Sequence, residues 1–316
     1  MKVRDIGEFG LIDRITKKPK DKKILVGIGD DAAVFKTDKG LQVLTTDCLV
    51  EGDHFRREWF SPFQIGMKAI EINVSDIAAM GAIPKYILVS MALPKNIDVE
   101  FVDALYEGMW KTCDRYGIEI IGGNMTHCEK IVISITLTGE VDNKNLCLRS
   151  GAKPGDFIFV SGHLGKGRAG LRLFQERING FEKVKKHYLE PKAQLKTALK
   201  ISPFVNSMID ISDGLAPEIK HICDQSRCGA IIYNDKIPIS QEVRAVAKRL
   251  EEGEYDYALY GGEDFELVYT VSKKNLDNVE GFLVGEIIKN KKISLYSNGK
   301  EKEIIEKGYD HFSRGI

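Results

Sequence analysis

No stretch of this sequence approaches the run of about 18 apolar residues that a transmembrane helix requires. The amino end, MKVRDIGEFG, lacks the apolar core of a secretory signal peptide. Net charge is absent as well, because 46 lysines and arginines balance 46 aspartates and glutamates in 316 residues. No basic field therefore favours nucleic acid. We expect a cytoplasmic protein with no membrane or nucleic-acid partner, which holds anionic ligands through local charges or metal ions.

Cysteine motifs and phosphate-binding loops are equally scarce. The six cysteines include no Cys-x-x-Cys pair, which argues against a zinc site and a disulfide framework. The sequence has no P-loop, because in GHLGKGRAG (162–170) Lys166 precedes glycine where a P-loop has Ser or Thr. GIGDDA (27–32) resembles the start of a dinucleotide turn, but Asp30 and Asp31 would repel a pyrophosphate. Bound phosphate must therefore be handled mainly by metal ions.

The composition is that of a soluble globular protein, with 43% hydrophobic and 29% charged residues. The length allows two domains of ordinary size. Within 148–162, the segment Gly-Ala-Lys-Pro-Gly interrupts the pattern before a fresh strand begins. We therefore expect one domain over residues 1–149 and a second over residues 150–316.

Both halves are predicted to be α/β. Residues 24–35 and 41–50 are predicted to form the two strands of a hairpin, separated by the turn TDKG. Ser61 and Pro62 predict the start of a helix that runs to Gly81. The other expected strands are 86–93, 118–124, 130–141, 156–162, 229–234, 263–271 and 282–288. The other expected helices are 98–116, one after the turn at 162–170, 191–200, 215–228 and 240–251.

Four acidic segments lie among glycine, alanine and aliphatic residues. They are GIGDDAAVF (27–35), TTDCLVEGDHF (45–55), NVSDIAAMGA (73–82) and IDISDGLA (209–216). Such carboxylates are not ordinary surface charges, so we expect them to converge on one partly dry site. Two carboxylates about 4 Å apart repel by roughly 4 kcal/mol at an effective dielectric near 20, so divalent cations must neutralise them. Oxygen ligands favour Mg²⁺, Mn²⁺ or Ca²⁺, and Mg²⁺ favours a nucleotide or another phosphate ester.

The candidate metal ligands differ in how well a structural role explains them. Asp47, with Thr45 and Thr46, is expected at a strand end, where two hydroxyls and a carboxylate would converge on one cation. A simple strand-end cap is the alternative. Asp76 interrupts an apolar helix, where a buried unpaired carboxylate costs several kcal/mol, so a structural role explains it less well.

Two further segments carry polar side chains at predicted element boundaries. Asp210 and Asp213 precede a helix; Asp213 could be its N-cap, but Asp210 could not serve the same helix. His54 follows the second strand, where a structural and a functional histidine are equally compatible with the sequence. The loop GGEDFEL (261–267) would bring Glu263 toward a substrate, with an ordinary surface turn as the alternative.

Taken in order, these segments resemble the thiamine-monophosphate kinases, which belong with aminoimidazole ribonucleotide synthetase and selenophosphate synthetase. The resemblance runs from GEFGLIDRI at 7–15 to GYDHF at 308–312, essentially the whole chain. It implies ATP-dependent phosphorylation of thiamine monophosphate to thiamine diphosphate by Mg²⁺-assisted in-line transfer, with several Mg²⁺ ions and ATP as co-substrate. It also implies the two-domain aminoimidazole ribonucleotide synthetase-like fold. Residues 1–149 would bind ATP and metal and form a homodimer, and the α/β domain of residues 150–316 would close over the nucleotide.

The resemblance also implies roles for single residues, and these agree with a reaction that depends on positioning and charge neutralisation. The implied metal ligands are Asp30, Thr45, Thr46, Asp47, Asp76, Asn124, Asp210 and Asp213. Among these, the catalytic candidates are Asp47 and Asp213. The residues implied to face ATP are Tyr106, Gly123, Asn124, Arg149 and Ser212. The residues implied to hold the thiamine moiety are His54, Glu263 and Tyr309.

The chain departs from the family pattern at Asn124. The family commonly has Gly-Gly-Asp-Thr where this chain has Gly-Gly-Asn-Met. An amide oxygen can bind a metal ion but brings no negative charge. Two alternatives therefore stay open: a related ATP-dependent phosphotransfer to another acceptor, and a nucleotide-binding relative without catalysis.

Overall fold

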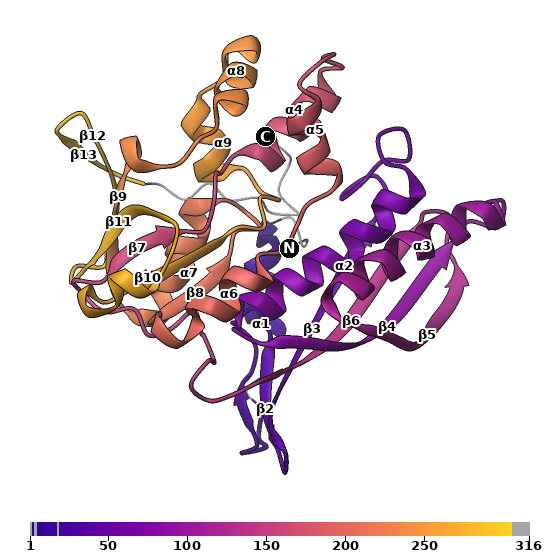
Figure 1. Ribbon diagram of the computed structural model, residues 1–316, viewed down its shortest axis with the longest axis horizontal. Coiled ribbons are helices and arrows are strands. Elements are labelled where there is room, and N and C mark those ends of the chain that lie inside the picture. Colours follow the sequence, from indigo (N-terminus) through magenta and orange to yellow (C-terminus); the bar gives the residue numbers. More distant parts are fainter. Residues whose placement is uncertain (1, 3–4, 18, 305–316) are drawn as a thin grey trace.

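Two mixed β-sheets, one from each half of the chain, organise this computed structural model (Figure 1). The structure describes residues 2, 5–17 and 19–304. The strands of the first sheet are β1 (Ile24–Val26), β2 (Ala33–Thr37), β3 (Gly40–Val50), β4 (Ile83–Leu93), β5 (Glu119–His127) and β6 (Val132–Val141). Their order is β1-β2-β3-β6-β4-β5, and only β4 and β5 pair in parallel. Helices α1 (Gly7–Ile15), α2 (Pro62–Ala79) and α3 (Val99–Tyr116) belong to this half.

The second half has a seven-stranded sheet. Its strands are β7 (Phe157–Val160), β8 (Ser207–Asp210), β9 (Gly229–Tyr233), β10 (Leu267–Val271), β11 (Phe282–Ile288), β12 (Ile293–Ser297) and β13 (Lys300–Glu303). They lie in the order β13-β12-β9-β11-β7-β10-β8, with β12 and β9 parallel. The helices are α4 (Lys166–Gln175), α5 (Glu182–Leu189), α6 (Leu195–Ile201), α7 (Leu215–Ser226), α8 (Gln241–Leu250) and α9 (Glu254–Tyr260). No helix in the described part of the chain has the length and apolarity needed to cross a membrane.

Helix α2 lies between the two halves and is buried over most of its length. It begins as predicted, because Ser61 and Gln64 form a reciprocal capping box and Pro62 occupies the first turn. One side of α2 packs on β3, β4 and β6 of the first sheet, and it also contacts α6 and β8 of the second half. A helix enclosed in this way can carry polar side chains into a site that both halves share.

The hydrophobic cores reflect this shared position of α2. One core joins residues of the first half to residues of the second, among them Met208, Leu267 and Tyr269. The other core is formed by the second half alone. The boundary predicted between residues 149 and 150 falls in the connection between β6 and β7, and it stays a prediction.

Several predicted elements need correction. The single strand expected over 24–35 is wrong, because β1 and β2 are separated by the loop 27–32, in which Gly29 has a φ of 118°. The strand expected over 263–271 starts only at Leu267, because Glu263 and Phe265 adopt left-handed φ values of 64° and 51°. The helix expected from 191 begins at Leu195. The sequence did not predict α1, α5, α9, β8, β12 and β13.

Helices α2 and α3 approach each other closely at two glycines. A β-carbon on Gly108 would lie 2.0 Å from the carbonyl oxygen of Phe63, and one on Gly66 would lie 1.9 Å from that of Leu105. Both neighbours are backbone atoms, so a side chain at either glycine forces the helices apart. The position of α2 on the sheet therefore depends on these two glycines.

We predict that Gly108→Ala destabilises the protein by about 1 to 3 kcal/mol, the usual cost of overpacking a core. Alanine is a better helix former than glycine, so helix propensity alone would make Gly108→Ala stabilising. The exposed neighbour Glu107 provides the control variant Glu107→Ala. Denaturant unfolding should show a lower midpoint for Gly108→Ala only, and equal midpoints for both variants would contradict the close approach.

Candidate active site

Three carboxylates from distant segments meet at the junction of the two halves. Asp31 lies in the loop before β2, Asp76 lies near the end of α2, and Asp210 ends β8. One oxygen atom of each lies within 4.8 Å of the others, a spacing that suits one shared cation. The carboxylates of three of the four acidic segments therefore converge as predicted, and the fourth segment reaches the cluster through the Thr45 hydroxyl, which bonds to Asp76. Asp31, however, was not among the predicted ligands.

Burial makes this cluster costly to ionise. Desolvation, followed by the charges of Asp47, Asp210 and Asp31, raises the pKa of Asp76 well above its usual value. Desolvation, followed by Asp31, raises the pKa of Asp210 to about 7. Hydroxyl groups partly offset this cost, because Thr45 Oγ1 donates to Asp76 at 2.7 Å and Ser75 Oγ donates to Asp210 at 2.6 Å. Without a cation, Asp210 therefore keeps its proton up to a pKa of about 7, and the raised pKa of Asp76 acts in the same direction.

Arg149 joins the cluster from the connection between the two sheets. Its Nε and Nη2 atoms donate to Asp31 Oδ1 at 3.1 and 2.5 Å, and its backbone N–H donates to Asp30 at 3.2 Å. The other oxygen of Asp31, Oδ2, is buried without a hydrogen-bond partner among the described residues. Desolvation and the charge of Asp31 raise the pKa of Asp30 to about 7. Arg149, predicted to face ATP, is thus bonded to the acids.

The donor set fits a hard divalent cation. All groups that converge are oxygens, and the orphaned Asp31 Oδ2 is an acceptor that a metal ion would satisfy. A neutral buried cluster would need hydrogen-bond donors for each oxygen instead. The residues present therefore suit Mg²⁺ or Mn²⁺ better than zinc, which favours nitrogen and sulfur.

A fourth buried carboxylate, Glu218 on α7, supports the segment that follows β8. Its Oε1 accepts the backbone N–H of Asp213 at 3.1 Å and the hydroxyl of Ser212 at 3.4 Å. Desolvation, then the charges of Asp213 and Asp210, raises its pKa well above the usual value. Asp213 does not cap α7, because Gly214 takes the N-cap position. The sequence signal for Glu218 was an acid in the first turn of a helix.

The two predicted acceptor residues lie on either side of a buried lysine. Lys68 on α2 donates to Glu263 Oε1 at 2.6 Å and to the carbonyl oxygen of His54 at 3.0 Å. His54 Nδ1 accepts the backbone N–H of Val50 at 3.1 Å. The structure therefore brings His54 and Glu263 together, whereas Tyr309 lies outside the described residues. Lys68 was missed because a single lysine in an amphipathic pattern resembles a surface residue.

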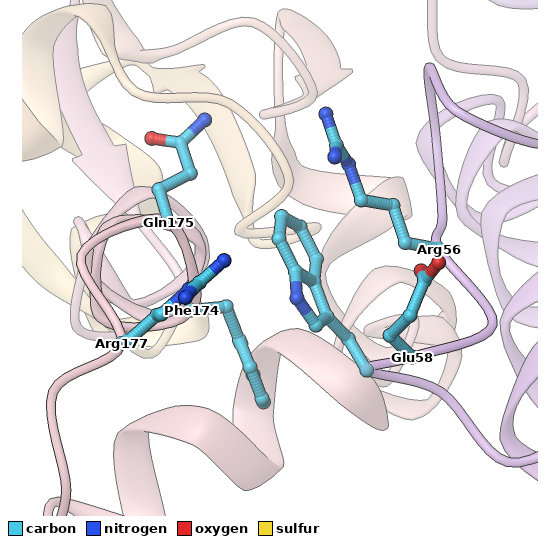
Figure 2. A pocket seen from close by; sticks show the side chains of 6 residues that line it. Arg56, Glu58, Phe174, Gln175 and Arg177 are labelled. Atoms are coloured by element: carbon cyan, nitrogen blue, oxygen red, sulfur yellow. The ribbon is translucent and has the colours of Figure 1, made fainter.

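A cleft of about 520 Å³ opens between the segment after His54 and the end of α4 (Figure 2). Its lining residues are Arg56, Glu58, Trp59, Phe174, Gln175 and Arg177. The rings of Trp59 and Phe174 stack with centroids 5.5 Å apart, and the Arg56 guanidinium lies 5.0 Å from the Trp59 ring. The cleft thus offers flat apolar surfaces together with hydrogen-bond donors and one carboxylate, which suits an aromatic heterocycle.

The glycine-rich segment 162–170 leads into α4, as expected, and is not a phosphate cradle. The backbone N–H groups of Gly165 and Gly167 donate to the buried carboxylate of Asp264 at 2.6 and 2.9 Å. Asp264 therefore occupies the place at the helix N-terminus where an anion would bind.

Two predicted metal ligands, Thr46 and Asn124, lie away from the acidic cluster of their own chain. Asp47 lies inside β3 and not at its end, and strand alternation puts Thr46 on the opposite face, where its hydroxyl donates to the carbonyl oxygen of Ile135. The expected convergence of both threonine hydroxyls with Asp47 is therefore wrong. Asn124 is exposed on the edge strand β5, and β6 and β4 separate it from β3 by about 14 Å in total.

Among the other predicted ATP residues, Tyr106 and Gly123 lie in the first half, whereas Ser212 lies after β8 in the second half, where its ATP role stays a prediction. Tyr106 is on α3, where its ring lies 5.7 Å from that of Trp110. Gly123 is on β5, and a β-carbon there would lie 1.8 Å from the carbonyl oxygen of Val89. Close strand packing by itself therefore explains glycine at this position. The roles assigned to Tyr106, Gly123 and Asn124 stay predictions.

Comparison with known proteins identifies the relatives of this chain. The family models for AIR synthase related protein match it, the N-terminal domain over residues 29–141 and the C-terminal domain over residues 153–296. Thiamine-monophosphate kinase of Aquifex aeolicus is 38% identical over 99% of this chain and 100% of its own length. That of Bacillus subtilis is 35% identical over 96% of this chain and 99% of its own length. The chain belongs to the thiamine-monophosphate kinase family.

A solved structure of this family extends the agreement to three dimensions. The complex described as AaThiL with AMPPCP and TMP matches with a TM-score of 0.90 and 35% identity, over 98% of this chain and 99% of that one. The resemblance to thiamine-monophosphate kinases drawn from the sequence motifs is therefore confirmed. The predicted mixed α/β fold is confirmed as well.

The raised carboxyl pKa values predict how stability depends on pH. In the folded state Asp30 and Asp210 keep their protons up to a pKa of about 7, whereas an unfolded aspartate releases its proton near 3.8. Between these values the folded state binds more protons, so both groups lower stability as the pH rises from about 4 to about 7. Above about pH 7 both groups are ionised in the folded and unfolded states, so their destabilising effect no longer changes with pH.

Thermal unfolding of metal-free protein tests this expectation. We compare the melting temperatures of Asp210→Asn and the natural protein at pH 5 and at pH 8. The difference, variant minus natural protein, should be larger at pH 8 than at pH 5 by at least about 3 °C. Mg²⁺ should stabilise the natural protein more at pH 8 than at pH 5, because protons compete with the metal. A pH-independent difference between the two proteins would contradict the proposed burial of charge at Asp210.

Proposed function

We propose that this protein transfers the γ-phosphoryl group of ATP to thiamine monophosphate, which yields thiamine diphosphate and ADP. The observation that carries the proposal is the buried cluster of Asp31, Asp76 and Asp210 in a chain that spans the full length of thiamine-monophosphate kinases. A phosphate acceptor and ATP together bring many negative charges into one site, and these acids can hold the cations that offset them. We infer that the protein acts in the cytoplasm, in thiamine diphosphate synthesis.

The proposed metal set combines the predicted ligands with one addition. We assign Mg²⁺ to Asp31, Asp47, Asp76 and Asp210, with Asp30 and Asp213 at the margins of the same cluster. Bound Mg²⁺ would neutralise phosphate oxygens and hold the two phosphate groups in line. Arg149, which forms an ion pair with Asp31, can turn one of its donors toward a phosphate.

We assign the acceptor to the region around His54 and Glu263. The Glu263 side chain is 29% exposed, so its carboxylate can face the positively charged thiazolium ring of thiamine. The pyrimidine ring would stack beside Trp59 in the neighbouring cleft (Figure 2). Pyrimidine nitrogens accept hydrogen bonds from arginine, and the exocyclic amine can donate one to Glu58.

We also infer a homodimer formed through the first sheet. The face of this sheet opposite α2 exposes Leu44 on β3 and Tyr86 and Leu88 on β4, the two strands that flank β6, each between 37% and 49% accessible. Asn124 lies at the edge of the same sheet and is separated from the acids of its own chain. If Asn124 binds metal or ATP, a second copy must therefore supply the acids of that site.

The direct test is ADP formation that depends on thiamine monophosphate, ATP and Mg²⁺, with thiamine diphosphate identified as the product. Turnover with another phosphorylated acceptor in its place would favour the related phosphotransfer enzyme. ATP binding without turnover on any acceptor would favour the non-catalytic relative. Chemical cross-linking and light scattering test the homodimer independently.

We predict that Asp76→Asn lowers kcat by more than about 100-fold, because loss of even an outer-shell partner of a metal costs about 10- to 100-fold. The fold should persist, because the amide has the same shape and relieves buried charge. Asp47→Asn should behave similarly. The exposed Asp114→Asn on α3 is the control, and near-normal turnover of Asp76→Asn at saturating Mg²⁺ would refute the metal assignment.

We predict that acceptor-side variants change the KM for thiamine monophosphate but not that for ATP. Glu263→Gln should raise it about 10-fold, the effect of one charged hydrogen bond, and His54→Ala should act in the same direction. Trp59→Ala should raise it by about 3- to 10-fold through lost stacking. A thiazole phosphate without the pyrimidine ring should be used equally by Trp59→Ala and the natural protein. Tyr296→Ala, a variant of an exposed aromatic on β12, is the control, and equal losses for both substrates would show that the assignment is wrong.

A further inference from the structure

Lys68 is the fully buried lysine at the centre of the acceptor region, with a side chain only 1% exposed. Its ammonium group donates to the Glu263 carboxylate at 2.6 Å and to the His54 carbonyl oxygen at 3.0 Å. It also lies 5.2 Å from the ring centre of Phe60 and 5.0 Å from that of Tyr188. Four separate segments of the chain therefore meet at one positive charge.

The groups around Lys68 explain how a charged lysine can be buried. An ammonium group without partners is too costly inside a protein, so buried lysines are paired or neutral. Here a carboxylate balances the charge, a carbonyl oxygen accepts a second hydrogen bond, and two aromatic faces offer cation–π contact. Loss of the lysine would leave the Glu263 carboxylate without this cation and the His54 carbonyl without its donor.

Glu263 needs such support because its backbone is held in an unfavourable conformation. Its φ of 64° lies in the left-handed region, which residues other than glycine seldom adopt. Its backbone N–H donates to the carbonyl oxygen of Ser212 at 2.8 Å, and that of Phe265 donates to Ile211 at 2.9 Å. The Glu263 loop is thereby tied to the segment between Asp210 and Asp213, and Lys68 fixes its side chain from the other side.

Lys68 and Asp76 lie on the same buried helix. They are eight residues apart on α2, which corresponds to about 12 Å along the helix axis. Asp76 faces the acidic cluster, where phosphate is proposed to bind, and Lys68 faces the residues proposed to bind the thiamine moiety. A rigid helix can therefore fix the distance between the two ends of the acceptor.

We propose that Lys68 is a positioning residue for the acceptor: it holds the Glu263 carboxylate and the His54 turn at a set distance from the Asp76 end of α2. The proposal rests on the proposed function, because it takes His54 and Glu263 as acceptor residues. Lys68 acts through Glu263 and His54 and does not itself contact the reacting phosphates. Lys68 bonds to Glu263 Oε1, and no described residue bonds to Oε2, so this second oxygen is available to the acceptor.

The test compares Lys68→Met, which removes the charge at similar length, with Lys68→Arg, which keeps it, and with the exposed control Lys111→Met on α3. Lys68→Met should raise the KM for thiamine monophosphate about 10-fold or more, the effect of losing a charged hydrogen bond. The KM for ATP should stay within about twofold of the natural value. Lys68→Arg should recover part of the loss.

A double variant separates positioning from a general structural role. Because Lys68 acts through Glu263 as well as through His54, the loss that Lys68→Met adds to Glu263→Gln should be smaller than the loss that Lys68→Met causes in the natural protein. Additive losses, or an equal rise of the KM for both substrates, would overturn the proposal. An unchanged KM for thiamine monophosphate in Lys68→Met would overturn it as well.

Hydrogen exchange tests the same idea without turnover. The backbone amides of residues 261–266 should exchange faster in Lys68→Met, and not in Lys111→Met, because the loop loses its side-chain anchor. If Lys68→Met does not fold, Lys68→Arg and Lys68→Gln permit the same comparison. An inactive natural protein would refute the proposed function while this measurement still decides the positioning role, and unchanged exchange would refute that role.

Discussion

Repulsion among the carboxylates of Asp31, Asp76 and Asp210 is the constraint on which the rest of this structure depends. With oxygens within 4.8 Å of one another, each ionised pair costs roughly 3 to 4 kcal/mol at an effective dielectric near 20. Protons can remove this cost at low pH, and cations can remove it at neutral pH. Hydrogen bonds from Thr45, Ser75 and Arg149 reduce the cost but do not satisfy every oxygen. The site is therefore arranged for positive charge that arrives with a ligand.

Helix α2 makes this costly arrangement possible because both halves of the protein bury it. The glycines at its contact with α3 let the helices approach, and packing on the first sheet and on β8 fixes its position. A helix held on all sides keeps Asp76 beside Asp210 despite their repulsion. The same helix presents Lys68 to the Glu263 loop, so one element supports both the acidic cluster and the proposed acceptor region.

The two halves contribute different chemistry to the junction between them. The first half supplies Asp31, Asp47 and Asp76, and the second supplies Asp210 and the strained loop at Glu263. Arg149 lies in the connection between the two sheets and binds the acids of the first half. Movement of one half relative to the other would therefore change both the charge pairing and the position of the residues proposed to bind the acceptor.

The sequence by itself determined the acidic, oxygen-rich character of the site, because carboxylates among glycine and aliphatic residues are seldom ordinary surface charges. It also determined the family and the start of α2, where Ser61 and Pro62 are local signals. Only the tertiary structure decided that Asp31 joins the cluster, that Thr46 faces away and that Lys68 is buried. These facts depend on strand register and on contacts between residues as far apart as Lys68 and Glu263. Local sequence patterns carry no information about such distant contacts, because packing of the two halves creates them.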